Sequence, residues 1–322
     1  MATIEKQPIP LTVLGGYLGA GKTTLLNRML RENDGRRLAV IVNDFGSINI
    51  DAELIENQDG ETINLANGCI CCSLADGLAT TLISLLHLPT PPDQIVIEAS
   101  GVADPTKMGQ YGYFLGFRLD GVIVLADAEQ IREKSTDKYV GETVIRQLKG
   151  ADLVVLNKVD LVTPEALADV HAWLVNLEPQ TRILETSYGQ IPMEFLLGLR
   201  EDRSQPVDSM LAHEGSDQKH SRHDHEHQKT YQTWSFISQE PIHEADVRAL
   251  ADNLPEGVLR AKGFVCLKED SERQYLLQLV GKRWSLTPTG SWGERQPETR
   301  LVFIGISGTI NEKHFEAALT GE

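Results

Sequence analysis

The chain has 322 residues, with 46 acidic and 30 basic side chains and a formal charge of −16. Its length exceeds that of a typical single domain and predicts a large domain and a smaller one, while the negative charge opposes non-specific binding to nucleic acid or anionic membranes. An apolar run of about 18 residues is absent, as are the charged and apolar regions of a signal peptide, so we expect a cytoplasmic protein that does not bind membranes.

Apolar runs alternate with helical patterns over the first 200 residues. Strands are predicted at residues 10–14, 38–43, 94–98, 121–126, 153–157 and 182–185, and helices at 24–31, 74–87, 141–150, 164–177 and 192–199. This alternation predicts an α/β domain, a doubly wound P-loop NTPase domain in residues 1–200, with ligands at the carboxyl ends of its strands.

A glycine-rich loop follows the first predicted strand. Residues 16–23 (GYLGAGKT) match the pattern G-x-x-x-x-G-K-T between a strand and a helix. In this pattern backbone N–H groups face phosphate oxygens, Lys22 reaches the outer phosphates and the Thr23 hydroxyl ligates Mg²⁺. The loop therefore predicts a nucleoside triphosphate site. Its expected nucleotide contacts are Gly16, Gly19, Ala20, Gly21, Lys22, Thr23 and Thr24.

Carboxylates stand at the ends of two further predicted strands. Asp44 follows the second strand and Glu98 ends the third. Each is a candidate to hold Mg²⁺ or to position water, so the candidate catalytic residues are Lys22, Glu98 and Asp44. The Gly101 N–H, in residues 98–101 (EASG), is expected to approach the terminal phosphate. An ordinary solvated acid at a strand end is the alternative for each carboxylate.

Residues 157–160 (NKVD) follow another predicted strand. A carboxylate at Asp160 can accept hydrogen bonds from the ring N–H and the amino group of guanine. Adenine offers an acceptor there instead and would leave the charge unpaired, at a cost of about 2–4 kcal/mol. Asp160 therefore predicts GTP rather than ATP. Asn157 and Lys158 belong to the same motif, and Ser187 is a further candidate for contact with the base.

Three thiols lie within four residues, at Cys69, Cys71 and Cys72. Thiolates favour Zn²⁺, with copper(I) as a competing ion and Co²⁺ or Ni²⁺ also compatible. Three sulfurs leave a tetrahedral site one ligand short, and such an open site suits metal transfer better than permanent structure. Buried small hydrophobic residues and a redox pair are the alternatives; the strain of a vicinal disulfide opposes the second.

Residues 201–229 lose helical and strand periodicity, which predicts a flexible linker. The linker carries a group of histidines that are candidates to hold zinc, nickel or cobalt loosely. A solvated polar run at a domain junction is the alternative. The candidate ligands are His220, His223, His225 and His227.

Residues 230–322 are predicted to form a smaller α+β domain, an antiparallel sheet with two helices on one face. Its expected strands are 231–238, 258–268, 274–280, 282–287 and 300–307, and its expected helices are 243–253 and 311–319. Cys266 alternates as an inward strand residue, so it is predicted to lie in the core.

Together these features resemble the CobW-type GTPases, P-loop metallochaperones similar to the urease and hydrogenase maturation GTPases. The resemblance rests on the phosphate-binding loop, the C-x-C-C segment, the EASG and NKVD motifs and a C-terminal domain, and it spans nearly the whole chain. It implies GTP hydrolysis coupled to the handling of zinc, or in some members cobalt, with the C-x-C-C thiols as ligands. Val42 stands where many members carry an acidic residue, which leaves Asp44 or water as the fourth ligand.

The sequence thus predicts a GTPase that binds GTP or GDP, Mg²⁺ and Zn²⁺ and delivers metal to an unidentified recipient metalloprotein. Because the cysteine segment lies between the elements that carry Asp44 and Glu98, moving one should move the other. An ATP-dependent small-molecule kinase is one alternative, which Asp160 opposes. A metal buffer or redox sensor with regulatory nucleotide binding is another. The physiological metal and homo-oligomer formation stay open.

Overall fold

The computed structural model describes residues 8–33, 35–42, 62–64, 74–198, 231–293 and 295–321. Contacts between Cα atoms separate the chain into two compact units, residues 1–197 and 198–322. The predicted linker, residues 201–229, lies outside the described residues. Within the described part of the chain, no helix is long and apolar enough to cross a membrane.

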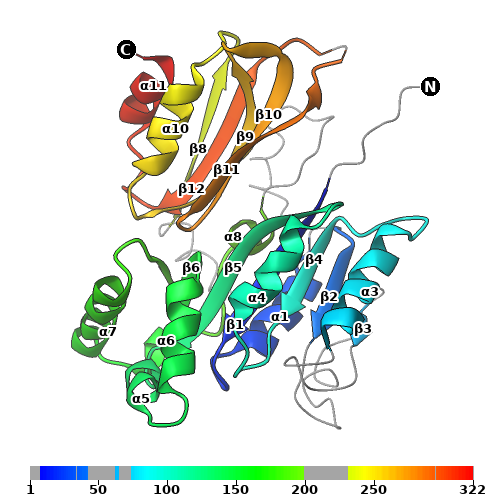
Figure 1. The fold of residues 1–322 in the computed structure, drawn as a ribbon. Helices are drawn as coiled ribbons and strands as arrows, with labels where there is room; N and C mark the ends of the chain where they lie inside the picture. Colours follow the sequence, from blue (N-terminus) through cyan, green and yellow to red (C-terminus); the bar gives the residue numbers. More distant parts are fainter. Residues whose placement is uncertain are drawn as a thin grey trace, which may run out of the picture. The chain divides into compact units, whose positions relative to one another are not determined.

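A parallel sheet forms the centre of the first unit (Figure 1). Its strands, within the described residues, follow the order β3-β2-β4-β1-β5-β6-β7, and every neighbouring pair is parallel. The order reverses beside β1, so the carboxyl end of β1 is the switch point at which doubly wound folds bind ligands. The strands are β1 (Ile9–Gly16), β2 (Leu38–Val42), β3 (Thr62–Asn64), β4 (Gln94–Glu98), β5 (Phe117–Asp127), β6 (Leu153–Asn157) and β7 (Arg182–Glu185).

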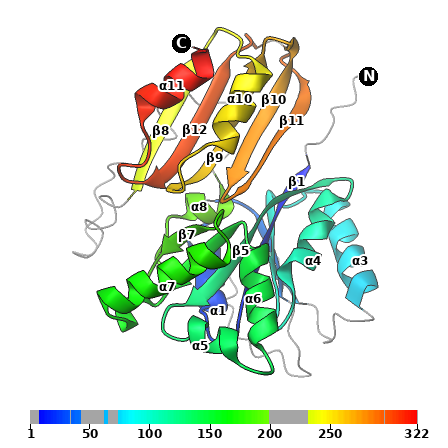
Figure 2. The ribbon, with the colours of Figure 1, turned by 60° about the vertical axis from the view of Figure 1, so that its left-hand side comes forward.

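Helices cover both faces of this sheet (Figures 1 and 2). Three central strands, β2, β4 and β6, are buried along their whole length, which explains their unbroken apolar sequences. The helices are α1 (Lys22–Arg31), α3 (Leu74–Leu86), α4 (Pro105–Gly109), α5 (Ile131–Thr136), α6 (Gly141–Gly150), α7 (Pro164–Leu177) and α8 (Met193–Leu197), with 3₁₀ turns η1 (Gln110–Tyr113) and η2 (Val159–Leu161).

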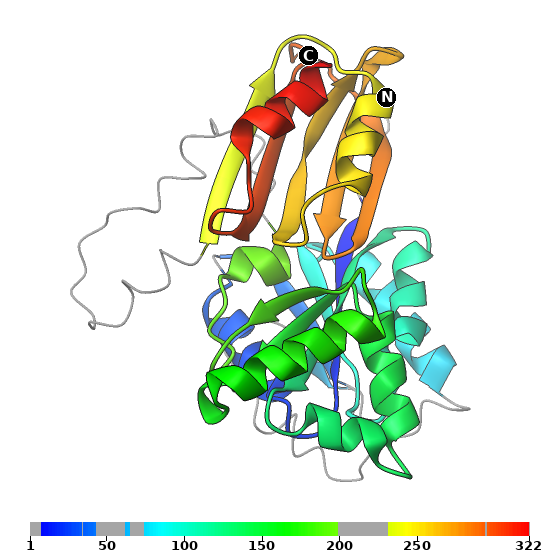
Figure 3. The same cartoon turned by 90° about the vertical axis from the view of Figure 1, so that its left-hand side faces the viewer.

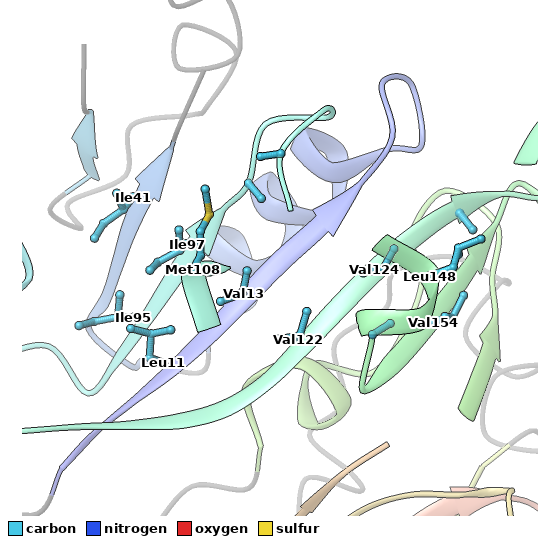
Figure 4. Close-up of a cluster of buried hydrophobic side chains, with 14 of the residues drawn as sticks. Leu11, Val13, Ile41, Ile95, Ile97, Met108, Val122, Val124, Leu148 and Val154 are labelled. Atoms are coloured by element: carbon cyan, nitrogen blue, oxygen red, sulfur yellow. The ribbon is translucent and has the colours of Figure 1, made fainter. Parts of the chain in front are cut away.

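One face of the sheet carries a continuous apolar core (Figure 4). Val13 of β1, Ile97 of β4 and other strand side chains lie there, and Met108 of α4 and Leu148 of α6 cover them. All of these side chains are buried. Packing of this kind fixes α4 and α6 against β1, which ends at the phosphate-binding loop, and against its neighbouring strands.

The predicted doubly wound architecture is confirmed, with local differences. Thr163 caps α7, because its Oγ1 accepts a hydrogen bond from the N–H of Ala166 at 3.3 Å, and Pro164 occupies the first turn, as predicted. The strand predicted at 121–126 begins at Phe117, because its first residues pair with the start of β1. The short helices α4 and α5 were not predicted, since single turns carry no recognisable period.

The second unit is a five-stranded antiparallel sheet in the order β11-β10-β9-β12-β8. Helices α10 (Glu244–Asp252) and α11 (Glu312–Thr320) pack on one of its faces, as predicted (Figure 3). The strands are β8 (Tyr231–Ser238), β9 (Val258–Leu267), β10 (Asp270–Val280), β11 (Arg283–Ser291) and β12 (Thr299–Ile306).

Aromatic rings fill the core of the second unit. The ring centroid of Phe303 lies 5.4 Å from that of Phe315 and 5.4 Å from that of Trp234, within the range of favourable aromatic pairs. Cys266 is fully buried in the same sheet, and this burial raises the pKa of its thiol. Cys266 therefore lies in the core, as predicted, and its raised pKa keeps the thiol protonated at neutral pH.

Replacing Phe303 with alanine should destabilise the second unit, because Phe303 is completely buried and its removal leaves a cavity. We expect the free energy of unfolding to fall by about 3–5 kcal/mol. Urea denaturation followed by tryptophan fluorescence measures this change. Ile237→Ala is the control: that side chain is 55% exposed and its truncation should cost less than about 0.5 kcal/mol. Equal effects of the two substitutions would contradict the packing described above.

Candidate functional site

The loop between β1 and α1 depends on glycine at three positions. Gly16, Gly19 and Gly21 have φ angles of 131°, 78° and 102°. A Cβ atom at Gly16 would lie 2.3 Å from the Leu125 carbonyl oxygen, and one at Gly21 would lie 2.6 Å from Asn157 Nδ2. Gly19 faces open space, so its backbone conformation alone favours glycine there.

Helix α1 begins at the end of this loop and presents an N-terminus suited to an anion. Gly21 precedes it in the left-handed conformation, no side chain caps the helix, and its first turn carries no acidic residue. The first-turn N–H groups and the helix dipole therefore favour phosphate at this end. Lys22 is buried, Thr23 is half-buried and Thr24 is exposed. The loop and helix thus fit a polyphosphate group.

The Asn157 side chain joins two loops at the carboxyl edge of the sheet. Its Nδ2 donates a hydrogen bond to the Ala20 carbonyl at 3.0 Å, and its Oδ1 accepts one from the Gly189 N–H at 3.1 Å. Asn157 is only 2% exposed. It therefore connects the phosphate-binding loop to the loop after β7, while its predicted contact with guanine stays a prediction.

Lys158 and Asp160 extend from the same strand end. Lys158 has a left-handed backbone, with φ 63°, and its Nζ lies 2.7 Å from Asp127 Oδ2. Asp127 Oδ1 also accepts a hydrogen bond from the Glu129 N–H at 3.0 Å. Asp160 is exposed in η2, so its carboxylate is accessible to a ligand.

The structure adds Asp127 to the residues expected from the sequence. Asp127 ends β5, and the parallel register pairs it with Asn157 at the end of β6. The available signal was an acidic residue after an apolar run beside the strand that carries the NKVD motif. Its contact with Lys158 places the Asp127 side chain beside the NKVD motif at this edge of the sheet.

Residues 187–189 are held from two sides. The Gly189 N–H is bonded to Asn157, and the Gly189 carbonyl accepts a hydrogen bond from Arg28 Nη1 of α1 at 2.7 Å. Tyr188 adopts a left-handed conformation with φ 55° and is largely exposed. Ser187 is half-buried next to it, so the structure places this candidate beside the anchored Gly189.

Glu98 and Gly101 lie next to the phosphate-binding loop. Glu98 ends β4, is 3% exposed and pairs in register with Leu14 of β1. A Cβ atom at Gly101 would lie 2.8 Å from the backbone nitrogen of Leu18, so Gly101 is in close contact with the loop. The sheet therefore brings these two predicted residues to the end of α1 at which phosphate is expected.

The other candidates fall outside the described residues. These are Asp44, the three clustered cysteines at 69, 71 and 72, and the linker histidines at 220, 223, 225 and 227. Among the residues that are described, no group of three or more histidine, cysteine or acidic side chains could hold a metal ion. The metal-binding roles of Asp44, the three cysteines and the four histidines therefore stay predictions.

Comparison with known proteins places this arrangement in a family. Residues 10–185 match the CobW/HypB/UreG nucleotide-binding domain, and residues 231–321 match the cobalamin synthesis protein cobW C-terminal domain. The chain belongs to the CobW/HypB/UreG family. Its glycine-rich loop and Asn157 lie within the matched nucleotide-binding domain.

Relatives of this CobW/HypB/UreG-family protein span almost its full length. The zinc chaperone CobW of Pseudomonas aeruginosa is 33% identical over 95% of this chain and 89% of the relative. The zinc chaperone YjiA of Escherichia coli K12 is 30% identical over 98% of each chain. The crystal structure of Zn(II)-bound YjiA GTPase from E. coli matches with 26% identity, a TM-score of 0.47 and coverage of 98% of this chain and 99% of that one.

Asn157→Ala should destabilise the nucleotide-free CobW/HypB/UreG domain. The substitution leaves the Ala20 carbonyl and the Gly189 N–H without their buried partner, at about 1–3 kcal/mol each. Differential scanning calorimetry should show a lower melting temperature before any nucleotide is added. Asn253→Ala is the control, because that side chain bonds only Ala249 of its own helix at the surface. A melting temperature unaffected by Asn157→Ala would refute the bridging role.

Proposed function

We propose that this protein is a GTP-hydrolysing metallochaperone that couples its nucleotide state to the binding and transfer of zinc. The observation that carries the nucleotide part is the Asn157 bridge, because it joins a phosphate-binding loop to a strand end that presents Asp160. Relatives named zinc chaperones, which align over 95% and 98% of this chain, support the metal part. The recipient is a metalloprotein that accepts the released ion.

The phosphates of GTP would lie on the loop after β1 and at the N-terminus of α1. Lys22 would neutralise charge on the outer phosphates, and the loop N–H groups would hold the rest. The ligands of Mg²⁺ would be Thr23, Glu98 and Asp44. When bound, Mg²⁺ would neutralise the negative charge that develops on the phosphate oxygens during hydrolysis.

Glu98 is suited to a role close to the reacting phosphate because its carboxylate is almost completely buried beside β1. In a buried, low-dielectric position, electrostatic interactions are stronger than in water. We assign to Glu98 the positioning of the attacking water and to the Gly101 N–H a contact with the terminal phosphate. The Gly101 assignment is supported by its proximity to Leu18 of the phosphate-binding loop, and the Glu98 assignment by its register with Leu14 of β1.

Guanine would be bound between Lys158, Asp160 and residues 187–189. Asp160 would accept two hydrogen bonds from guanine, while Asp127 holds the Lys158 side chain through its ion pair. Asn157 would set the position of this pocket relative to the phosphates, since it bonds both loops. The proposed preference for GTP over ATP rests on the Asp160 carboxylate.

Zinc, the proposed cargo, would be held by Cys69, Cys71 and Cys72, with Asp44 or water as fourth ligand and the linker histidines as a weaker reservoir. Sheet register supports coupling to the nucleotide. In adjacent strands Asn64 pairs with Val42, and Val42 pairs with Glu98. Strands β2 and β3, which Asp44 and the cysteines follow in the sequence, therefore end level with Glu98.

Asp160→Asn should change base selectivity. We expect GTP to bind about 30- to 700-fold more weakly, the equivalent of 2–4 kcal/mol, and XTP to bind better than GTP, because an asparagine amide can donate to the C2 carbonyl of xanthine. Calorimetric titration with GTP, XTP and ATP measures the three affinities. Asp169→Asn, on the exposed face of α7, is the control and should leave all three unchanged. Preference of the natural protein for ATP would overturn the assignment.

The variant with Cys69, Cys71 and Cys72 all changed to serine should lose zinc binding, measured by elemental analysis and calorimetry. Cys266→Ala is the matched control, because that thiol is buried and protonated.

In the natural protein, zinc affinity should differ between the GDP-bound form and a form with a non-hydrolysable GTP analogue, and nucleotide affinity should change by the same factor with zinc. Independent affinities would refute the coupling.

A further inference from the structure

A buried glutamine of α6 contacts the segment that follows Glu98. Gln147 is 2% exposed, and its Nε2 donates hydrogen bonds to the carbonyls of Gly101 at 3.1 Å and Ala103 at 2.7 Å. Both hydrogens of the amide are thus used on two peptide groups of one irregular segment. Burial of an amide is unfavourable without such partners, so these bonds account for a polar side chain on the packed face of this helix.

The same segment touches the phosphate-binding loop on its other side. A Cβ atom at Gly101 would lie 2.6 Å from Leu18 Cδ2 and 2.8 Å from the Leu18 backbone nitrogen. Closer to Glu98, the Ala99 N–H donates to the Leu14 carbonyl of β1 at 2.8 Å. Gly101 is therefore enclosed between Leu18 and Gln147, and a shift of the segment in either direction meets one of them.

Helix α6 also contacts the start of α4, and the two helices lie side by side (Figure 2). A Cβ atom at Gly150 would lie 2.3 Å from Thr106 Cγ2. Asp104 caps α4 by accepting hydrogen bonds from the N–H and Oγ1 of Thr106, at 3.0 and 2.6 Å. α6 thus holds the segment at its middle through Gln147 and at its end through Gly150.

We propose that Gln147 is a positioning residue for GTP hydrolysis: it fixes the Gly101–Ala103 peptide groups so that the segment after Glu98 is held against the phosphate-binding loop. This inference rests on the proposed GTPase function. Gln147 acts on the loop through Gly101, whose carbonyl it bonds. Because Asn157, Lys158 and Asp160 lie at other strands, loss of the amide should slow hydrolysis and leave the binding of GDP intact.

Gln147→Met tests this proposal, since methionine keeps the length of the side chain and removes both donors. We expect kcat to fall about 10- to 100-fold, the effect of a small misplacement near the reacting groups, with KM and the GDP dissociation constant changed less than about 2-fold. Gln94→Met is the matched control. Gln94 is equally buried and donates to Thr12 Oγ1 at 2.9 Å, but it lies at the opposite end of β4 from Glu98. The Gln94→Met variant should be less stable than the natural protein and keep its kcat.

A second variant covers the case in which Gln147→Met does not fold. In Gln147→Glu an ionised carboxylate would face two carbonyl oxygens, whereas a protonated one donates a single hydrogen bond, so kcat should recover partly as the pH falls. The natural protein and Gln94→Met should not show this recovery.

The outcomes distinguish the proposed GTPase function from the proposed positioning role of Gln147. If the natural protein binds GDP but does not hydrolyse GTP, the proposed function fails and the role of Gln147 in hydrolysis fails with it. If the natural protein hydrolyses GTP and Gln147→Met keeps its kcat, only the role of Gln147 is overturned. It is also overturned if GDP affinity falls as much as kcat, or if Gln94→Met lowers kcat equally, because either result indicates general loss of structure.

Discussion

The arrangement of the candidate site depends on one buried amide, that of Asn157. It is bonded on one side to Ala20 in the phosphate-binding loop and on the other to Gly189 after β7. The approach is possible because Gly21 has no side chain: a Cβ atom there would lie 2.6 Å from the amide nitrogen. Arg28 bonds the carbonyl of the same Gly189, so α1, its preceding loop and the base-side loop form one connected network.

The phosphate-binding loop is thus supported differently on its two sides. On the side of β6 and β7 the Asn157 side chain bonds the Ala20 carbonyl of the loop, and Arg28 holds Gly189, the other partner of Asn157. On the side of β4 the loop meets the backbone of Gly101, which is held in turn by Gln147. Separate supports, Asn157 of β6 for the base side and Gln147 of α6 for the phosphate side, would let the two sides respond separately to the nucleotide and to its terminal phosphate.

Much of this architecture could be predicted from local sequence patterns. Buried strands gave unbroken apolar runs, α7 carried its Thr163 cap, and the glycine-rich loop carried its own motif. Interactions between distant residues could not be predicted. In sequence Gln147 is an ordinary helix residue between Val144 and Leu148, and only the packing of α6 brings its amide to Gly101. Asp127 could not be assigned to the site from sequence either, because only the register of β5 with β6 places it beside Asn157.

Net charge explains why these local supports matter for a nucleotide. A chain with a formal charge of −16 repels a nucleoside triphosphate at long range, although salt screens this repulsion beyond about 8 Å at physiological ionic strength. Attraction must therefore come from fixed groups within the site: the first-turn N–H groups of α1 and the Lys22 ammonium. Such dipoles act only when their orientation is held. The bonds that fix the loop backbone, from Asn157 above all, are then a condition for binding an anion on an acidic protein.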